Sequence, residues 1–146
     1  MSSAAQKSLS NFSVALLMRL RRIECVKMIA QVQMLAASSP SMSVQLTYNN
    51  RNLAGDGSLE PANAGLSKLG RKTIERIEAE KLLLDLSHGG AKSMAEAAAY
   101  AKRPMVISHT GAKALTDHPR NTADETIKGV ADKGGVVGVY FMIFGS

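Results

Sequence analysis

Cysteine, tryptophan and long hydrophobic runs are scarce in this sequence. Its 146 residues include one cysteine, Cys25, and no tryptophan, with only three phenylalanines and three tyrosines. A single cysteine excludes an intrachain disulfide and a zinc site built from cysteines. So few aromatic rings leave little for stacking on bases, and nucleic acid is therefore not an expected partner despite the net charge of +6.

Hydrophobic runs are short throughout. None approaches the ~20 residues that span a bilayer, and Val14–Met18 is too short for a convincing secretory core. The sequence therefore predicts no transmembrane segment and a soluble protein, with the cytoplasm as the default compartment. An apolar content of 45% supports one domain with a core. An eight-unit α/β barrel usually takes about 250 residues, so either the fold is smaller or the chain is a piece of a barrel.

The chain divides near Pro40. Residues 1–40 form a predicted N-terminal helical extension, with one helix over Val14–Ala37, where good helix formers dominate and apolar residues recur at helical spacing. A helix packed on the domain and a basic amphipathic or transit-like segment both fit this pattern. Ser38–Ser41 ends the helix.

Residues 41–146 show alternating strand and helix patterns. The predicted strands are Met42–Tyr48, Leu82–Ser87, Met105–Ser108 and Val136–Phe141, and the predicted helices are 67–80, 92–102 and 123–133. This alternation predicts an α/β fold of parallel βα units with right-handed crossovers. The continuous apolar run Leu82–Ser87 predicts a strand covered on both faces, and Asn49–Ala64 is predicted to be a long loop.

Two histidines follow apolar strand-like runs in equivalent positions. His88 and His109 are separated by 21 residues, about one strand, one crossover helix and their turns. Neighbouring parallel strands would bring both imidazoles to the carboxyl edge of the sheet, where α/β folds place their chemistry. A lone histidine beside a strand is more often a hydrogen-bonded core residue, but two at equivalent positions favour a shared metal.

Other polar residues allow more than one interpretation. Asp85 lies inside an apolar strand, where a carboxylate must be hydrogen-bonded or paired, and it could orient a neighbouring ligand. His118, before Pro119, is predicted to be a solvated turn residue. Arg120 could grip a carboxylate with its two-pronged guanidinium or form a surface ion pair.

Several motifs in order resemble the central part of the membrane dipeptidase (renal dipeptidase-like) family of metallopeptidases. They are Leu46-Thr47-Tyr48-Asn49, Gly65-Leu66-Ser67 with Gly70-Arg71, Asp85-Leu86-Ser87-His88, Ser108-His109, His118-Pro119-Arg120-Asn121 and Gly134-Gly135-Val136-Val137-Gly138-Val139. The resemblance covers about Val44–Phe141, which identifies 41–146 as part of a dipeptidase barrel domain. Residues 1–40 stand outside it and need not be homologous.

The resemblance implies a zinc-dependent dipeptidase built on a metal-dependent (β/α)8 TIM-type barrel, with two zinc ions in the complete site. It implies that His88 and His109 ligate one zinc, that Arg120 holds the terminal carboxylate of a dipeptide substrate, and that Tyr48 contacts the substrate. Many members have a histidine in the place of Tyr48. Such chemistry is physically coherent, because paired metals activate a bridging water while an arginine selects a free C-terminus.

Parts of the family pattern are missing from the chain. No His-x-Asp pair precedes the matched region, Glu24 lacks the glycines expected beside the bridging glutamate, and the closing aspartate would lie beyond Ser146. We therefore expect a fragment of about four strands and three crossover helices, with at most one zinc. Its open strand edges predict self-association or a homo-oligomer. The alternative function is a noncatalytic barrel remnant that binds one metal weakly or only self-associates.

Overall fold

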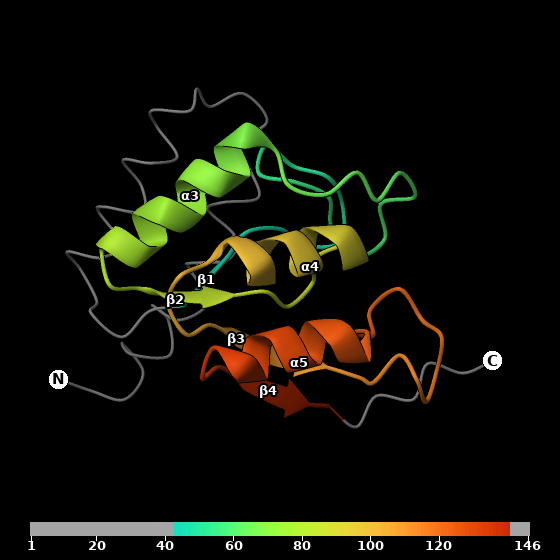
Figure 1. The fold of residues 1–146 in the computed structure, drawn as a ribbon. Coiled ribbons are helices and arrows are strands. Elements are labelled where there is room, and N and C mark those ends of the chain that lie inside the picture. The colour runs from blue at the N-terminus through green and yellow to red at the C-terminus, as the bar shows by residue number, and fades with distance from the viewer. Residues whose placement is uncertain (1–42, 141–146) are drawn as a thin grey trace, which may run out of the picture.

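A computed structural model describes residues 43–140 of the chain, as four strands alternating with three helices (Figure 1). In chain order the elements are β1 (Ser43–Gln45), α3 (Lys68–Ala79), β2 (Leu83–Asp85), α4 (Ala91–Tyr100), β3 (Val106–Thr110), α5 (Asp124–Asp132) and β4 (Val136–Val139). The predicted alternation is confirmed, with each strand shorter than the sequence pattern suggests except β3. The predicted helix Val14–Ala37 lies outside the described residues.

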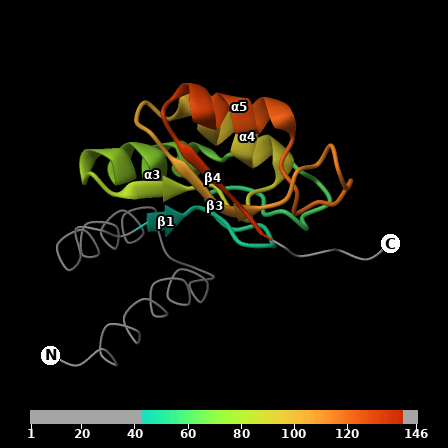
Figure 2. The ribbon, with the colours of Figure 1, turned by 90° about the horizontal axis from the view of Figure 1, so that it is seen from below.

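The four strands form one parallel sheet in the order β1-β2-β3-β4. Strands that neighbour one another in sequence are therefore neighbours in space, as in a (β/α)8 barrel and unlike a doubly wound sheet. Figure 2 shows α3, α4 and α5 on the same face of this sheet. The arrangement is part of such a barrel, not closed within the described residues, and it confirms the predicted fold class.

Helix α3 begins where the sequence predicts. Ser67 is its N-cap, and the Ser67 hydroxyl accepts a hydrogen bond from the Gly70 backbone N–H at 3.0 Å. Ile74 and Ile77 are fully buried on the side that packs on the sheet. The chain leaves the helix through Lys81, which has a φ of +58°, and enters β2 directly.

The core lies between the sheet and the three helices. It consists of Val44, Ile74, Ile77, Leu82, Leu84, Leu86, Met94, Ala97, Ala98, Ala101, Met105, Ile107 and Val130. On the sheet, successive side chains point to opposite faces, so Leu84 is buried under the helices while Leu83 is 42% exposed. The prediction that this strand is covered on both faces therefore holds for Asp85 and Ser87, which share the side of Leu83 and are 4% and 1% exposed, but not for Leu83 itself.

The long loop predicted over Asn49–Ala64 is confirmed, and a buried aspartate organises it. Asp56 is 2% exposed, accepts two hydrogen bonds from the Arg51 guanidinium at 2.6 and 3.1 Å, and also accepts one from the Ala64 N–H. The isolated bridge between Gly57 and Gly89 ties this loop to the turn after β2. The loop is therefore anchored beside the carboxyl end of the sheet.

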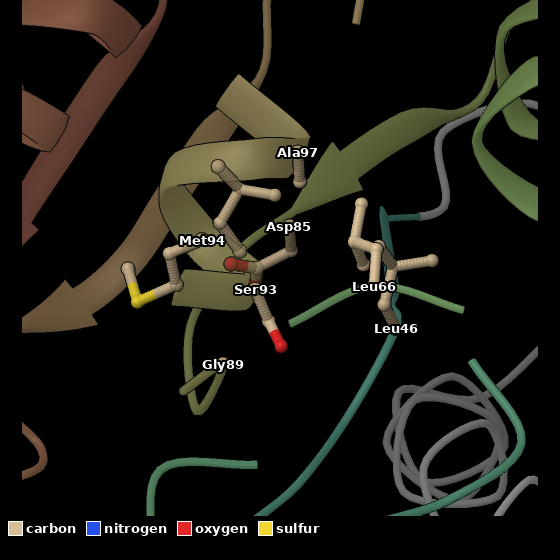
Figure 3. A pocket seen from close by; sticks show the side chains of 8 residues that line it. Leu46, Leu66, Asp85, Gly89, Ser93, Met94 and Ala97 are labelled. Atoms are coloured by element: carbon tan, nitrogen blue, oxygen red, sulfur yellow. The ribbon is translucent and has the colours of Figure 1, made fainter. Parts of the chain in front are cut away.

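A small cavity lies between β2 with the turn after it, α4, and the side chains of Leu46 and Leu66 (Figure 3). Its volume is about 10 Å³, the size of a single water molecule, and most of its lining is apolar. Ser93 contributes a buried hydroxyl that has no hydrogen-bond partner within the described residues. The cavity is too small for a substrate.

None of the helices within residues 43–140 is long and apolar enough to cross a bilayer.

Candidate metal centre

The imidazole rings of His88 and His109 lie against one another at the carboxyl edge of the sheet. Their centroids are 4.8 Å apart, with an edge-on angle of 67°. His88 is the third residue after the end of β2, whereas His109 lies inside β3, one residue before its end. The prediction that neighbouring strands bring the two rings together agrees with this geometry, although His109 does not follow its strand as the sequence pattern suggests.

His88 is held by the long loop. Its backbone has a φ of +65°, a left-handed conformation that a side chain other than glycine rarely adopts, and its carbonyl accepts a hydrogen bond from the Ser58 N–H at 2.9 Å. Its Nδ1 lies 2.9 Å from the Asn49 side-chain oxygen, which also accepts the Ser58 hydroxyl at 3.1 Å. Because that oxygen only accepts, His88 Nδ1 carries the proton and Nε2 keeps its lone pair.

The Tyr48 ring covers His88. The two rings are stacked, with centroids 4.0 Å apart and an angle of 20° between their planes. Tyr48 itself is 41% exposed. It therefore stands between the buried imidazole and solvent.

Burial keeps His88 neutral. Burial, together with the smaller electrostatic effects of Arg120 and His109, lowers the pKa of His88 to about 4, while Asp85 acts in the opposite direction. A neutral imidazole is the form that binds a metal ion. At neutral pH, His88 is therefore in the protonation state that a metal ligand requires.

His109 is held by side chains of the sheet. Its Nδ1 lies 2.8 Å from the Ser108 hydroxyl, and its backbone N–H donates to the Ser87 hydroxyl at 3.1 Å. The Ser108 hydroxyl in turn donates to Asp85 at 2.6 Å. The buried Asp85 carboxylate is therefore hydrogen-bonded, which is one of the two possibilities, hydrogen bonding or ion pairing, that the sequence allows for it.

Arg120 lies in the loop between β3 and α5 and interacts electrostatically with this site. Burial lowers its pKa, and the neighbouring Tyr140 and Tyr48 oppose that shift. Its backbone N–H donates to His118 Nδ1 at 3.1 Å. None of the ion pairs found between residues 43 and 140 includes Arg120. Its role in binding a carboxylate stays a prediction.

His118 differs from its prediction. It is half-buried instead of fully solvated, and its ring accepts the Arg120 N–H and so shapes the turn that carries the arginine. His118 is not one of the two rings at the sheet edge.

The residues that sequence reasoning missed are those that hold the rings: Asn49, Ser58, Ser87 and Ser108. One signal was present, since a serine precedes each histidine, in Ser87-His88 and in Ser108-His109. Ser58 carried no such signal, because its contact with Asn49 depends on how the long loop folds back.

The two imidazoles fit one half of a zinc site. Each has Nδ1 engaged in a hydrogen bond and an Nε2 that can bind a metal, the usual arrangement of ligating histidines. Over residues 43–140 no group of three or more His, Cys, Asp or Glu side chains is placed to hold a metal ion. The part of the chain that is described therefore holds two imidazoles that could serve as nitrogen ligands, and no third side chain of these types beside them.

Comparison with known proteins places this geometry in a family. The sequence model of the membrane dipeptidase family (peptidase family M19) matches residues 7–144, so the similarity extends further toward the N-terminus than the motifs indicate. The chain is 30% identical over 101 residues to dipeptidase verJ of Clonostachys rogersoniana, which covers 68% of this chain and 26% of that protein. It is 39% identical over 77 residues, 53% of this chain and 28% of the relative, to a Klebsiella pneumoniae protein described as an uncharacterized protein in the pqqA 5′ region.

Solved structures agree. The chain superposes on an amidohydrolase from Pseudomonas aeruginosa with a TM-score of 0.70 and 38% identity, covering 76% of this chain and 34% of that one. The probable dipeptidase PvdM from the same species also gives a TM-score of 0.70, at 30% identity over 76% of this chain and 30% of its own. The chain thus spans about a quarter to a third of the length of its relatives. With the family match over nearly the whole sequence and the paired histidines at the sheet edge, the chain belongs to the membrane dipeptidase family, peptidase family M19.

Proposed function

We propose that this chain is part of a zinc-dependent dipeptidase in which His88 and His109 bind one zinc ion through Nε2. The observation that carries the proposal is the approach of the two rings to 4.8 Å, each with Nδ1 already engaged. When bound, zinc supplies an activated water and polarises the scissile carbonyl of a dipeptide. Residues 43–140 would serve at most one zinc, and the remaining ligands of a complete site would lie outside them.

Arg120 is proposed to bind the free carboxylate of the substrate. Its guanidinium has no ion-pair partner within the described part of the chain and interacts electrostatically with Tyr48 and His88. A planar guanidinium holds a carboxylate with two parallel hydrogen bonds, which sets the substrate's orientation as well as its affinity. Tyr48, stacked on His88 and partly exposed, would contact the substrate beside the metal.

Relatives support a dipeptide as the substrate class. Both verJ and PvdM are described as dipeptidases, PvdM as a probable one. In this proposal residues 41–146 belong to the barrel domain and residues 1–40 are an N-terminal extension of it.

A second function is a noncatalytic remnant that binds one metal weakly or associates with copies of itself. It is favoured by exposed apolar side chains on the sheet strands, where Leu83 is 42%, Val136 67% and Val139 73% exposed. Apolar surface of this kind favours association.

The test measures zinc and hydrolysis on the same purified 146-residue chain. Zinc per chain is determined after dialysis, together with its affinity, and turnover is followed with a simple dipeptide such as alanyl-alanine. We expect one zinc in the wild type and its loss in both His88→Ala and His109→Ala. His118→Ala is the matched control, since it removes the third histidine of the chain without touching the pair, and it should retain zinc.

The outcomes separate the two functions. Turnover that disappears with either ring of the pair supports the dipeptidase. One weakly held zinc without turnover, in a chain that sediments as an oligomer, supports the remnant. Full zinc binding in both His88→Ala and His109→Ala would defeat the proposed ligands.

A further inference from the structure

We propose that Asp85 is a positioning residue that acts through Ser108: it fixes the ring proton of His109 on Nδ1 and so leaves Nε2 free for the metal. The inference rests on the proposed function, since it gives a reason for a buried carboxylate next to a metal-binding histidine. It concerns Asp85, Ser108 and Ser87, none of which binds the metal itself.

Asp85 is an acceptor surrounded by donors. It lies in β2, is 4% exposed, and its Oδ1 accepts the backbone N–H groups of Ser87 at 2.9 Å and Ser108 at 3.1 Å. Its Oδ2 accepts the Ser108 hydroxyl at 2.6 Å. An ionised carboxylate has no proton to give, so the direction of all three hydrogen bonds is determined at this end.

The hydrogen bond to Asp85 also fixes the direction of the hydrogen bond between Ser108 and the His109 ring. A serine hydroxyl has one proton and two lone pairs, and the proton is used on Asp85. The Ser108 oxygen can therefore only accept from its other two neighbours, His109 Nδ1 at 2.8 Å and the Ser87 hydroxyl at 3.1 Å. It follows that His109 Nδ1 carries the proton.

Ser87 completes the network. Its oxygen accepts the backbone N–H of His109 at 3.1 Å, and its own proton goes to Ser108, the direction left open by the previous step. Ser87 is 1% exposed. The position of every hydrogen-bonding proton among these groups is now determined, and the neutral His109 ring has its lone pair on Nε2. Carboxylates and other groups behind a metal-binding histidine commonly set its tautomer in this way.

The substitution Asp85→Asn keeps the shape of the side chain but removes its charge. It should allow the Ser108 hydroxyl proton to change its partner. The Oδ1 position must stay an oxygen because it faces two backbone N–H groups, so the amide nitrogen takes the place of Oδ2 and donates to Ser108. The Ser108 proton is then free to turn to His109 Nδ1. We expect the tautomer with the proton on Nε2, which blocks the metal-binding nitrogen, to become populated.

The experiment is ¹⁵N NMR of the histidine rings in the metal-free 146-residue chain, at about pH 8 where free imidazoles are neutral. The wild type should show His109 protonated on Nδ1, and Asp85→Asn and Ser108→Ala should show both tautomers. Ser108→Thr keeps a hydroxyl and should restore the wild-type spectrum. Asp56→Asn is the matched control, a buried aspartate outside this network, and should leave the His109 tautomer unchanged. Zinc affinity should fall about 10–100-fold in Asp85→Asn and Ser108→Ala.

The result that would overturn the proposal is a His109 proton on Nε2 in the wild type, or a tautomer that Asp85→Asn changes no more than Asp56→Asn does. Should Asp85→Asn fail to fold, Ser108→Ala decides, because it leaves the backbone contacts of Asp85 in place. The tautomer is measured without metal, so this test does not depend on zinc binding. If the chain gives the predicted spectra but binds no zinc, the proposed function is refuted and the role of Asp85 stands.

Discussion

His88 and His109 reach the same point of the sheet edge with different support. His88 is left-handed, buried, and held by the long loop through Asn49 and by stacking with Tyr48. His109 has ordinary strand geometry inside β3 and is held by side chains from its own and the adjacent strand.

This difference has a mechanical consequence. The position of His109 is set by pairing within the sheet, so it should persist as long as β2 and β3 stay paired. The position of His88 depends on a loop of more than fifteen residues that contributes no strand or helix, and loops are the less stable parts of a fold. Changes in the loop should therefore disturb one ring and spare the other.

Gly57→Ala should have the largest effect. An added Cβ would lie well inside van der Waals contact with the Tyr48 carbonyl oxygen and 2.6 Å from that of Asn49, and both are backbone atoms that cannot turn away. We expect a loss of about 3 kcal/mol in unfolding free energy, with faster amide exchange in the loop and at His88 while β3 and β4 keep their protection. Chemical denaturation and hydrogen exchange measure the two effects.

Gly129→Ala is the control for this substitution. Gly129 lies in α5, where an added Cβ meets no atom within 4 Å, so alanine should be neutral or stabilise by up to about 1 kcal/mol through helix propensity. Equal stability of both variants, or equal loss of protection around His88 and His109, would contradict separate support for the two rings.

Asp56→Asn should have an intermediate effect. The Arg51 guanidinium, through its hydrogen bond, holds the pKa of the Asp56 carboxyl below its ordinary value, and the Ala64 N–H adds to this while burial opposes it. Loss of this charge-assisted contact should cost about 1.5–3 kcal/mol at pH 7. A lowered pKa in the folded state contributes stability above the unfolded value of about 3.9, and that contribution is lost as the pH falls through the folded pKa. The gap between variant and wild type should therefore close below about pH 4.

Asp132→Asn is the counterpart on the other side of the molecule. Asp132 forms an exposed ion pair with Lys128, both more than half exposed, so its loss should change stability by less than about 0.5 kcal/mol. Urea denaturation of both variants at pH 7 and at about pH 2 makes the comparison, and a gap for Asp56→Asn that stays constant down to the lower pH would refute the assigned charge contribution.

The sequence predicts the frame of this site better than its interior. Alternating apolar runs and the cap at Ser67 place the strands and helices within a few residues, because those signals are local. The spacing of His88 and His109 predicts their approach since parallel neighbours share an edge. Their role as metal ligands stays a prediction, as do the substrate contacts of Arg120 and Tyr48.

What holds the rings could not be predicted, because it depends on contacts distant in sequence. Asn49 meets His88 across 39 positions, and Ser108 meets Asp85 across 23. No periodicity encodes such pairs. The buried position of Asp85 was visible as a polar residue in an apolar run, but the choice between a cation and hydrogen bonds as its partner required the fold.

Among Gly57→Ala, Asp56→Asn and Tyr48→Leu, the last should have the smallest effect on stability and the most local one. Stacked rings contribute about 0.5–1.5 kcal/mol beyond the area they bury, and the value here should lie at the low end because Tyr48 is 41% exposed. Leucine removes the ring current that a stacked aromatic exerts on His88 at a centroid distance of 4.0 Å, so the His88 ring protons should shift downfield. Tyr48→Phe keeps the ring and should leave those shifts nearly unchanged. The His109 ring contacts the edge of the His88 ring and is not stacked on Tyr48. The chemical shifts of its ring protons should therefore change less in both variants. Equal shifts at both histidines would mean that the two rings respond as one unit, and that the loop supports His109 as well as His88.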